Sequence, residues 1–228
     1  MGEEVTMERF RDFHENIDSL YNYGNCGLPF DEQLSILSNK DKLKDWLLHS
    51  SSEYYIVYEN LTLFLDRYCD DSSIIDRLYL EDCIDEEDEN LLLDIFCDYI
   101  VNRYSFSWLG GCEHASDLTP HTKVRLYRMV SVDSPKDFSF SKEHMGVCWT
   151  CDKEVLDNLQ VGVYGDVILY LEADTEAKDI DLLTSTIYVY HEYANETEVR
   201  LMRTDSVDLL NIYDDSWNKV WSKEEGWL

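Results

Sequence analysis

The 228-residue chain has few of the residues that bend or interrupt a polypeptide, with only 9 Gly and 3 Pro. This scarcity argues against a collagen-like or low-complexity chain. Positive charge is also scarce, because 19 Lys and Arg stand against 48 Asp and Glu and give a formal net charge of −29. Such a field repels phosphate groups, so we expect no direct binding to nucleic acid or to an anionic membrane.

Long apolar runs are missing as well, and no stretch of sequence approaches the ~20 residues that cross a bilayer. The start of the chain, Met1–Glu4, has neither a basic nor an apolar segment of the kind found in signal peptides. Seven cysteines are an odd number, which favours reduced and mostly buried thiols. We therefore expect a cytoplasmic protein, located in the host cytoplasm if a virus encodes it.

What the sequence does contain is enough apolar material for a core, with 44% hydrophobic and 13% aromatic residues. Over residues 7–102 the apolar positions recur at helical spacing, and the clearest amphipathic stretch is Leu91–Val101. Asp31 and Asp41 are candidate helix starts. The sequence predicts a helical domain over residues 1–110.

The residue pattern changes at Trp108–Pro120, a segment that we interpret as a linker. Stretches rich in β-favouring residues follow at 123–130, 166–172, 186–190, 198–202 and 207–213. One short helix is predicted at 152–159, with Thr150 or Asp152 as its cap. The predicted class is therefore α+β, with an N-terminal helical domain followed by a strand-rich domain over 111–228.

A dense acidic run occupies residues 81–89. The favoured interpretation is a solvated loop that leads into a helix, since the helix dipole stabilises Asp88 and Glu89 in a first turn. The alternative is an acidic docking surface for a partner protein.

Arg128 lies between Tyr127 and Met129 in an otherwise apolar predicted strand. Its guanidinium stays charged and needs an anionic partner, and its planar fork suits a phosphate or a carboxylate. An ion pair with one of the many acidic residues is the structural alternative.

Glu196 and Glu198 are two residues apart, so in an extended chain both side chains point to one face. Two neighbouring carboxylates hold one proton more tightly than free Glu and can divide acid–base work between them. The structural alternative is a pair of exposed glutamates on the polar face of an edge strand.

Together, Arg128, the segment Cys148–Asp152 and the Glu196–Glu198 pair resemble the arginine, Ser-Thr-Ser and Glu-x-Glu motifs of the ADP-ribosyltransferase family, in the same order. The resemblance covers roughly Thr122 to Tyr213. It implies that the second domain has that family's fold and uses NAD as a substrate.

The resemblance also implies a role for each matching residue. Arg128 would hold the NAD phosphates, and the segment with Trp149, Thr150 and Cys151 would brace the site. Glu198 would stabilise the oxocarbenium-like transition state, Glu196 would activate an acceptor arginine, and Tyr193 matches an aromatic residue of the catalytic loop.

The sequence departs from the family's pattern at two places. Met129 follows the arginine where the family has Gly, and Trp149-Thr150-Cys151 replaces Ser-Thr-Ser, with Ser139 and Ser141 as another register. A catalytically degenerate member of the fold is therefore an alternative.

Cys148 and Cys151 form a Cys-x-x-Cys before the predicted helix, a pattern also seen in thioredoxin-like redox sites. With Cys112, His114 or His121 they could also hold a structural zinc ion, but Cys112 and His114 lack a usual ligand spacing. Buried thiols are the favoured interpretation, and we expect no metal.

Two functions follow from these features. The first is a mono-ADP-ribosyltransferase that transfers ADP-ribose from NAD to a protein side chain, with arginine as the first candidate acceptor. Such a protein would be a phage or bacterial effector. The second is an acidic inhibitor protein, such as a virus-encoded nucleic-acid mimic. In both, the expected partner is a protein that is basic or binds nucleic acid.

Overall fold

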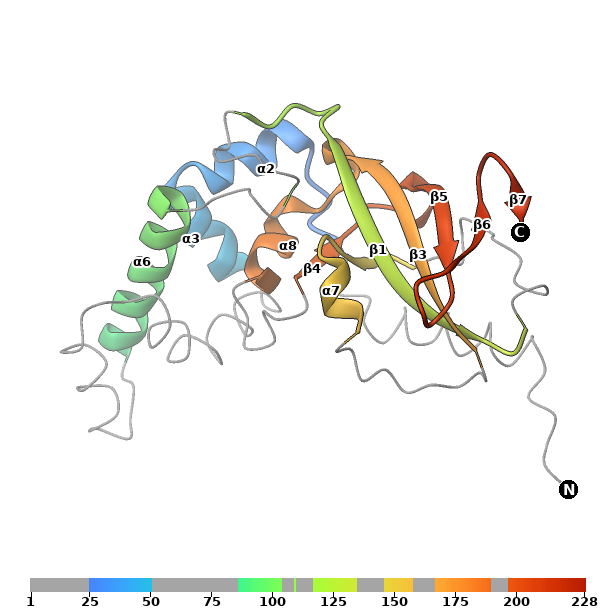
Figure 1. The fold of residues 1–228 in the computed structure, drawn as a ribbon. Helices are drawn as coiled ribbons and strands as arrows, with labels where there is room; N and C mark the ends of the chain where they lie inside the picture. The colour runs from blue at the N-terminus through green and yellow to red at the C-terminus, as the bar shows by residue number, and fades with distance from the viewer. Residues whose placement is uncertain are drawn as a thin grey trace, which may run out of the picture.

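The computed structural model describes residues 25–50, 86–103, 109, 117–134, 146–157, 167–189 and 197–228. Helices α2 (Phe30–Leu37), α3 (Lys40–His49) and α6 (Glu86–Arg103) come first, and strands dominate after residue 122. Figure 1 shows these three helices on one side of the molecule and the sheet on the other. The predicted α+β class is confirmed, because helices are combined with a seven-stranded antiparallel sheet.

Two long strands form the centre of the sheet. β1 (Lys123–Val132) pairs antiparallel with β3 (Val167–Glu176) along the whole length of both strands. The order across the sheet is β4–β2–β1–β3–β5–β6–β7. The other strands are β2 (Cys148–Thr150), β4 (Glu198–Arg200), β5 (Asp208–Tyr213), β6 (Lys219–Ser222) and β7 (Gly226–Trp227).

Side chains of the central strands alternate between two unlike faces. The inner face is apolar and buried, with Leu126 of β1 and Leu171 of β3 fully enclosed. The outer face carries polar groups: Arg125 donates hydrogen bonds to Glu172 and Asp174 from the neighbouring strand. This difference between the faces fixes the register, because a one-residue slip would expose the apolar set.

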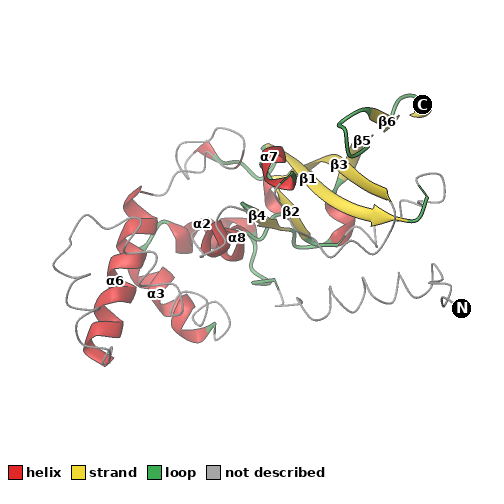
Figure 2. Cartoon of the chain, turned by 60° about the horizontal axis from the view of Figure 1, so that its bottom comes forward, coloured by secondary structure: helices red, strands yellow, loops and turns green. Residues whose placement is uncertain are grey.

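Helices α2, α3, α6 and α8 share one hydrophobic cluster with the inner face. Helix α8 (Leu182–Val189) lies beside β4 and contacts α2, as the view in Figure 2 also shows. The cluster includes Leu43, Leu93 and Ile187 from the helices together with Leu126 and Leu171 from the sheet. One continuous core therefore joins the first part of the chain to the second.

Gln33 makes this junction specific. It lies fully buried in α2, and its Oε1 accepts hydrogen bonds from the backbone N–H groups of Leu182 (2.7 Å) and Leu183 (3.3 Å). Its Nε2 donates to the Leu28 carbonyl at 2.8 Å. A side chain of an early helix therefore satisfies two amides at the start of α8, which have no partner within that helix.

Most predicted elements that fall on described residues are confirmed. Strands occur within 123–130, 166–172, 198–202 and 207–213, and α6 contains the predicted stretch 91–101. The short helix predicted at 152–159 is α7 (Lys153–Leu156), and its cap is Asp152, which accepts from the Glu154 N–H. The helical patterns predicted over residues 7–24 and 51–85 lie outside the described residues.

The strand predicted at 186–190 is wrong, because residues 186–189 belong to helix α8; residue 190 lies outside the described residues. Its β-branched residues favour a strand locally. Capping from other parts of the chain prevails. The buried Asp181 carboxylate accepts from the N–H and hydroxyl of Thr184, and Gln33 Oε1 accepts from the two amides before it.

The helix starts at Asp31 and Asp41 are displaced by one or two residues. α2 begins at Phe30 after Pro29, and Asn39 caps α3 by accepting from the Lys42 N–H. Both aspartates lie in first turns, where the dipole favours them. Of the helices in the described ranges, none is long and apolar enough to pass through a membrane.

Candidate functional site

The sheet brings three distant segments of sequence side by side. Tyr127 of β1 pairs with Thr150 of β2, and Thr150 pairs with Glu198 of β4. The strand that carries Arg128, the strand that carries Trp149 and Thr150, and the strand that begins with Glu198 are therefore neighbours. Glu196 and Tyr193 lie outside the described residues.

Arg128 takes an unusual route from its strand. Because Tyr127 faces the same way as Thr150 and Glu198, alternation directs the Arg128 side chain toward the other face of the sheet. Its guanidinium nevertheless reaches the start of β2, where Nη1 donates to the Cys148 carbonyl at 2.8 Å. This bond uses one of five N–H donors of the guanidinium.

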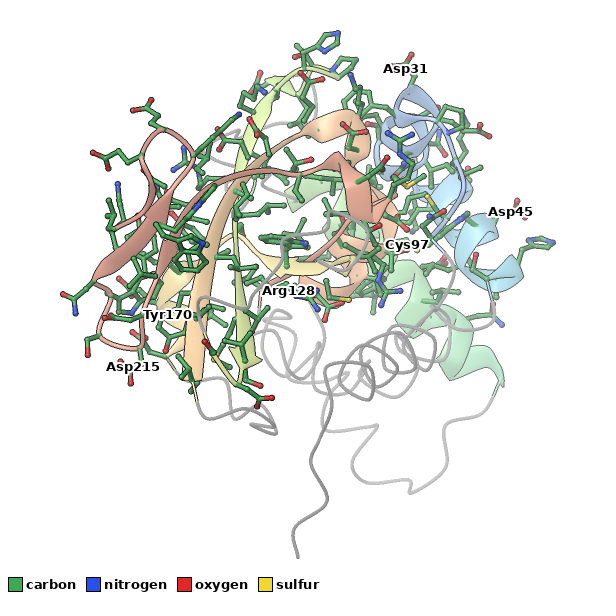
Figure 3. All side chains as sticks on the ribbon, turned by 90° about the vertical axis from the view of Figure 1, so that its right-hand side faces the viewer. Asp31, Asp45, Cys97, Arg128, Tyr170 and Asp215 are labelled. Carbon is green, nitrogen blue, oxygen red and sulfur yellow. The ribbon has the colours of Figure 1, made fainter. Side chains whose placement is uncertain are left out.

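Gly146 makes room for this guanidinium. A Cβ atom at this position would lie 2.7 Å from Arg128 Cζ, closer than carbon atoms approach without a shift. The backbone of Gly146 is also in the left-handed region, with φ +67°, which favours glycine. In the view of Figure 3, Arg128 lies between the helices and the part of the sheet that bears Tyr170.

Trp149 and Thr150 are enclosed. Trp149 is 3% exposed within the hydrophobic cluster, and its indole N–H donates to the Gly146 carbonyl at 3.3 Å. The Thr150 hydroxyl lies 2.7 Å from the Thr197 hydroxyl and accepts from the Asp152 N–H at 3.1 Å. In this arrangement the two residues brace the strands around them and offer little surface to a cofactor.

Cys148 lies on β2, between the strands of Arg128 and Glu198; the sequence favours a buried thiol here, with a redox or zinc site as alternatives. It pairs with Arg200 across the β2–β4 ladder. Burial raises the pKa of its thiol to about 12, the Glu198 carboxylate adds to the rise, and Arg200 and Arg128 oppose it. Arg128 and Glu198 therefore both act electrostatically on one side chain. No local sequence pattern could have shown this, because the placement of Cys148 depends on strand register.

Glu198 is held beside a buried cation. Arg200 lies two residues along the same strand, and its Nη2 is 3.6 Å from Glu198 Oε1. The Glu198 side chain is 26% exposed, whereas that of Arg200 is 3% exposed. Glu198 Oε1 itself is buried and accepts no hydrogen bond within the described part of the chain. Because this oxygen is enclosed by protein, a ligand would meet the exposed part of the Glu198 side chain instead.

Thr197, the residue between the two glutamates, has a strained backbone. Its φ is +40°, in the left-handed region that a β-branched residue rarely adopts. Its hydroxyl bond to Thr150 ties this conformation to β2. Strain of this type persists only where the surroundings fix it, and it concentrates at functional sites.

The Cys-x-x-Cys segment lacks the properties of a redox pair. Burial is the largest cause that raises the thiol pKa of Cys148 to about 12 and of Cys151 to about 11, which disfavours the reactive thiolate. Both cysteines are free, and the helix that follows them has four residues. The geometry therefore gives the redox alternative no support.

The described residues do not support the zinc alternative either. Within the described ranges, no group of three or more His, Cys, Asp and Glu side chains is arranged to hold a metal ion. His121 instead lies 3.0 Å from Glu176, and Cys112 and His114 are outside the described residues.

A second polar cluster lies on the outer face of β1, β3 and β5. Glu172 accepts hydrogen bonds from Arg125, from Asn211 Nδ2 (2.7 Å) and from Tyr213 Oη (2.7 Å). Burial raises the pKa of Glu172, but these three donors outweigh it and hold the pKa below its usual value. Because its partners satisfy both carboxylate oxygens, the cluster fixes the strands rather than offering a binding site.

Comparison with known proteins identifies no relative. The chain matches no protein-family model, no curated protein and no solved structure.

Proposed function

We propose that this protein is a mono-ADP-ribosyltransferase, which cleaves the nicotinamide–ribose bond of NAD and transfers ADP-ribose to a protein side chain, arginine first. One observation carries the proposal. Arg128 and Glu198 are far apart in sequence but both meet the short strand β2. Arg128 Nη1 donates to the Cys148 carbonyl at 2.8 Å, and Glu198 pairs with Thr150, so a cation and a carboxylate are gathered at one part of the sheet. The strained Thr197 beside Glu198 adds support.

The chemistry needs two opposite charges held apart. Departure of nicotinamide leaves positive charge on the ribose, and a fixed carboxylate stabilises that charge. Glu198 has this role in the proposal, with Arg200 holding the carboxylate in place at 3.6 Å. Arg128 keeps donors for the NAD phosphates beyond the one that binds the Cys148 carbonyl.

In this proposal β2, the strand between β1 and β4, braces the site. Cys148 and Thr150 point to the face of Glu198, and the Thr150 hydroxyl bond fixes Thr197. Glu196 would remove a proton from the acceptor guanidinium, so its loss would uncouple NAD cleavage from transfer.

The proposal is tested with the full chain, labelled NAD and an arginine-rich acceptor protein, by measuring nicotinamide release and label transfer separately. Glu198→Gln is expected to lower both rates by on the order of 100-fold or more, because the carboxylate is lost with little change in shape. Glu196→Gln is expected to retain nicotinamide release and lose transfer. Glu224→Gln, an exposed glutamate in the β6–β7 turn, is the matched control.

Three outcomes would overturn the proposal. They are a wild-type chain that neither binds NAD nor releases nicotinamide, equal rates for Glu198→Gln and Glu224→Gln, and unchanged NAD binding in Arg128→Gln.

The formal charge of −29 favours a second candidate, an acidic protein that covers a basic surface on a partner. Its test is capture of a basic nucleic-acid-binding protein at about 0.05 M and 0.5 M salt, where screening differs strongly. This candidate predicts capture that high salt abolishes and that survives both Arg128→Ala and Glu198→Ala. Capture that high salt leaves unchanged would contradict it.

A further inference from the structure

An open pocket of about 470 Å³ lies away from the Arg128–Glu198 site, on the outer side of the sheet. Lys153, Glu154 and Asp157 from α7 line it, together with Trp217 from the turn between β5 and β6. α7 contacts β1, and Trp217 comes from the β5–β6 turn, on the opposite side of the central strands from β2 and β4. The pocket therefore needs an explanation of its own.

Trp217 is fixed in this pocket from several directions. Its ring stacks on Tyr170, with centroids 4.4 Å apart and planes 22° apart, and its Nε1 donates to Asp157 Oδ1 at 3.0 Å. The turn beneath it is held by Asp214, which accepts from the N–H groups of Ser216 and Asn218. Figure 3 shows Tyr170 and the turn residue Asp215 at the same end of the sheet.

A positive charge already sits over this ring. Lys153 Nζ lies 5.6 Å from the Trp217 ring centroid, within the range of a cation–π interaction. The Lys153 side chain is on the exposed surface of α7, so the ammonium can leave the ring at small cost. An aromatic ring that already holds an exposed cation of the same chain is able to accept a cation from outside.

We propose that this pocket binds an arginine side chain of a basic partner protein, which takes the place of Lys153 over Trp217. A guanidinium is planar and weakly hydrated, so it stacks on an indole ring better than an ammonium does. The Glu154 and Asp157 carboxylates line the same pocket and can accept its N–H groups. The net charge of −29 attracts a partner of the required sign. The proposal is independent of NAD chemistry.

The probe is a short peptide with a single arginine, titrated into the full chain at about 0.15 M salt, where long-range attraction is screened. The readouts are the dissociation constant and the shift of the Trp217 indole N–H signal. Trp217→Ala is expected to weaken binding at least 10-fold, and replacing arginine by lysine in the peptide to weaken it about 3-fold or more. Trp227→Ala, another partly exposed tryptophan, is the control and is expected to bind normally.

Lys153→Gln gives the sharper test, because it removes the internal competitor without touching the ring. It is expected to tighten binding at least 3-fold relative to Lys123→Gln, which removes the same charge from a side chain that is 66% exposed at the far end of β1. Equal affinities for these two variants, or an unmoved Trp217 signal during the titration, would overturn the proposal. Loss of NAD turnover in the other tests would leave this result unaffected.

Discussion

Gly146 meets a backbone requirement and a side-chain requirement at the same time. Its φ of +67° disfavours any other residue, and the Arg128 guanidinium fills the space where a side chain would begin. Gly27 has nearly the same φ, +66°, but no atom within 4 Å of its Cβ position. The two glycines therefore separate the cost of backbone strain from the cost of steric overlap.

We expect Gly27→Ala to lower the free energy of unfolding by about 1–2 kcal/mol, the cost of left-handed backbone for an L-residue. Gly146→Ala is expected to cost about 1–3 kcal/mol more, because the guanidinium must also move. Urea unfolding followed by circular dichroism measures both losses. In an Arg128→Ala background the extra cost should vanish, and its persistence there would contradict the described contact.

At the scale of elements, α8 depends on groups outside itself. Its first amides are satisfied by the Asp181 carboxylate and by Gln33 Oε1 from α2, all in a buried region. A helix whose own residues favour a strand needs such caps to exist. The N-terminus of α8 is therefore where the two parts of the chain depend most directly on each other.

Gln33→Met keeps the approximate volume of the side chain and removes its hydrogen bonds. It is expected to lower the free energy of unfolding by about 1–3 kcal/mol, because the Leu182 and Leu183 amides stay buried without an acceptor. Glu32→Met, at the neighbouring exposed position of α2, should stay within about 0.5 kcal/mol of the wild type. Chemical denaturation of both variants is the measurement, and equal stabilities would show that Gln33 is not a cap.

The same elements show what sequence can reveal about this fold. β1 and β3 are long runs of β-favouring residues, so their pattern alone predicts them. The segment 182–189 also contains β-favouring residues, but it forms a helix. The side chain that caps this helix, Gln33, lies 149 residues earlier in the chain, so a local pattern cannot reveal it. The β6–β7 hairpin was not predicted, since strands of four and two residues give too short a pattern to recognise.

The candidate site was predictable only in outline. The order of Arg128, Thr150 and Glu198 along the chain suggested one location, and the sheet order β4–β2–β1 makes their strands neighbours. The role of Cys148 was missed, because its position in a Cys-x-x-Cys pattern directs attention to metals and redox chemistry. Its position between Arg128 and the Glu198 strand depends on strand register, which no local pattern contains.

At the scale of the whole molecule, the dominant property is an excess of negative charge that the fold must tolerate. Local ion pairs, such as Lys44 with Asp94 between helices α3 and α6 and Lys223 with Asp208, offset a small part of it. Repulsion among the remaining carboxylates destabilises a compact state, and dissolved salt weakens this repulsion.

We therefore expect the melting temperature to rise as sodium chloride is raised from about 0.01 M to about 0.15 M, over which the Debye length falls from about 30 Å to about 8 Å. Differential scanning calorimetry measures the rise. Potassium chloride at equal ionic strength is the control and should give the same curve, because screening does not depend on the identity of the ion. A melting temperature independent of ionic strength would contradict the expectation.

The Gln33 cap also has a consequence for synthesis of the chain. Gln33 is made long before residues 182 and 183 exist. At about 5–20 residues per second, the 149 residues from position 34 to Leu182 take roughly 7–30 s to make. During that interval the early helices have no α8 to dock on, so the nascent protein passes through a stage at which this apolar surface is uncovered. Expression at lower temperature or with a holdase chaperone is therefore expected to raise the yield of folded protein.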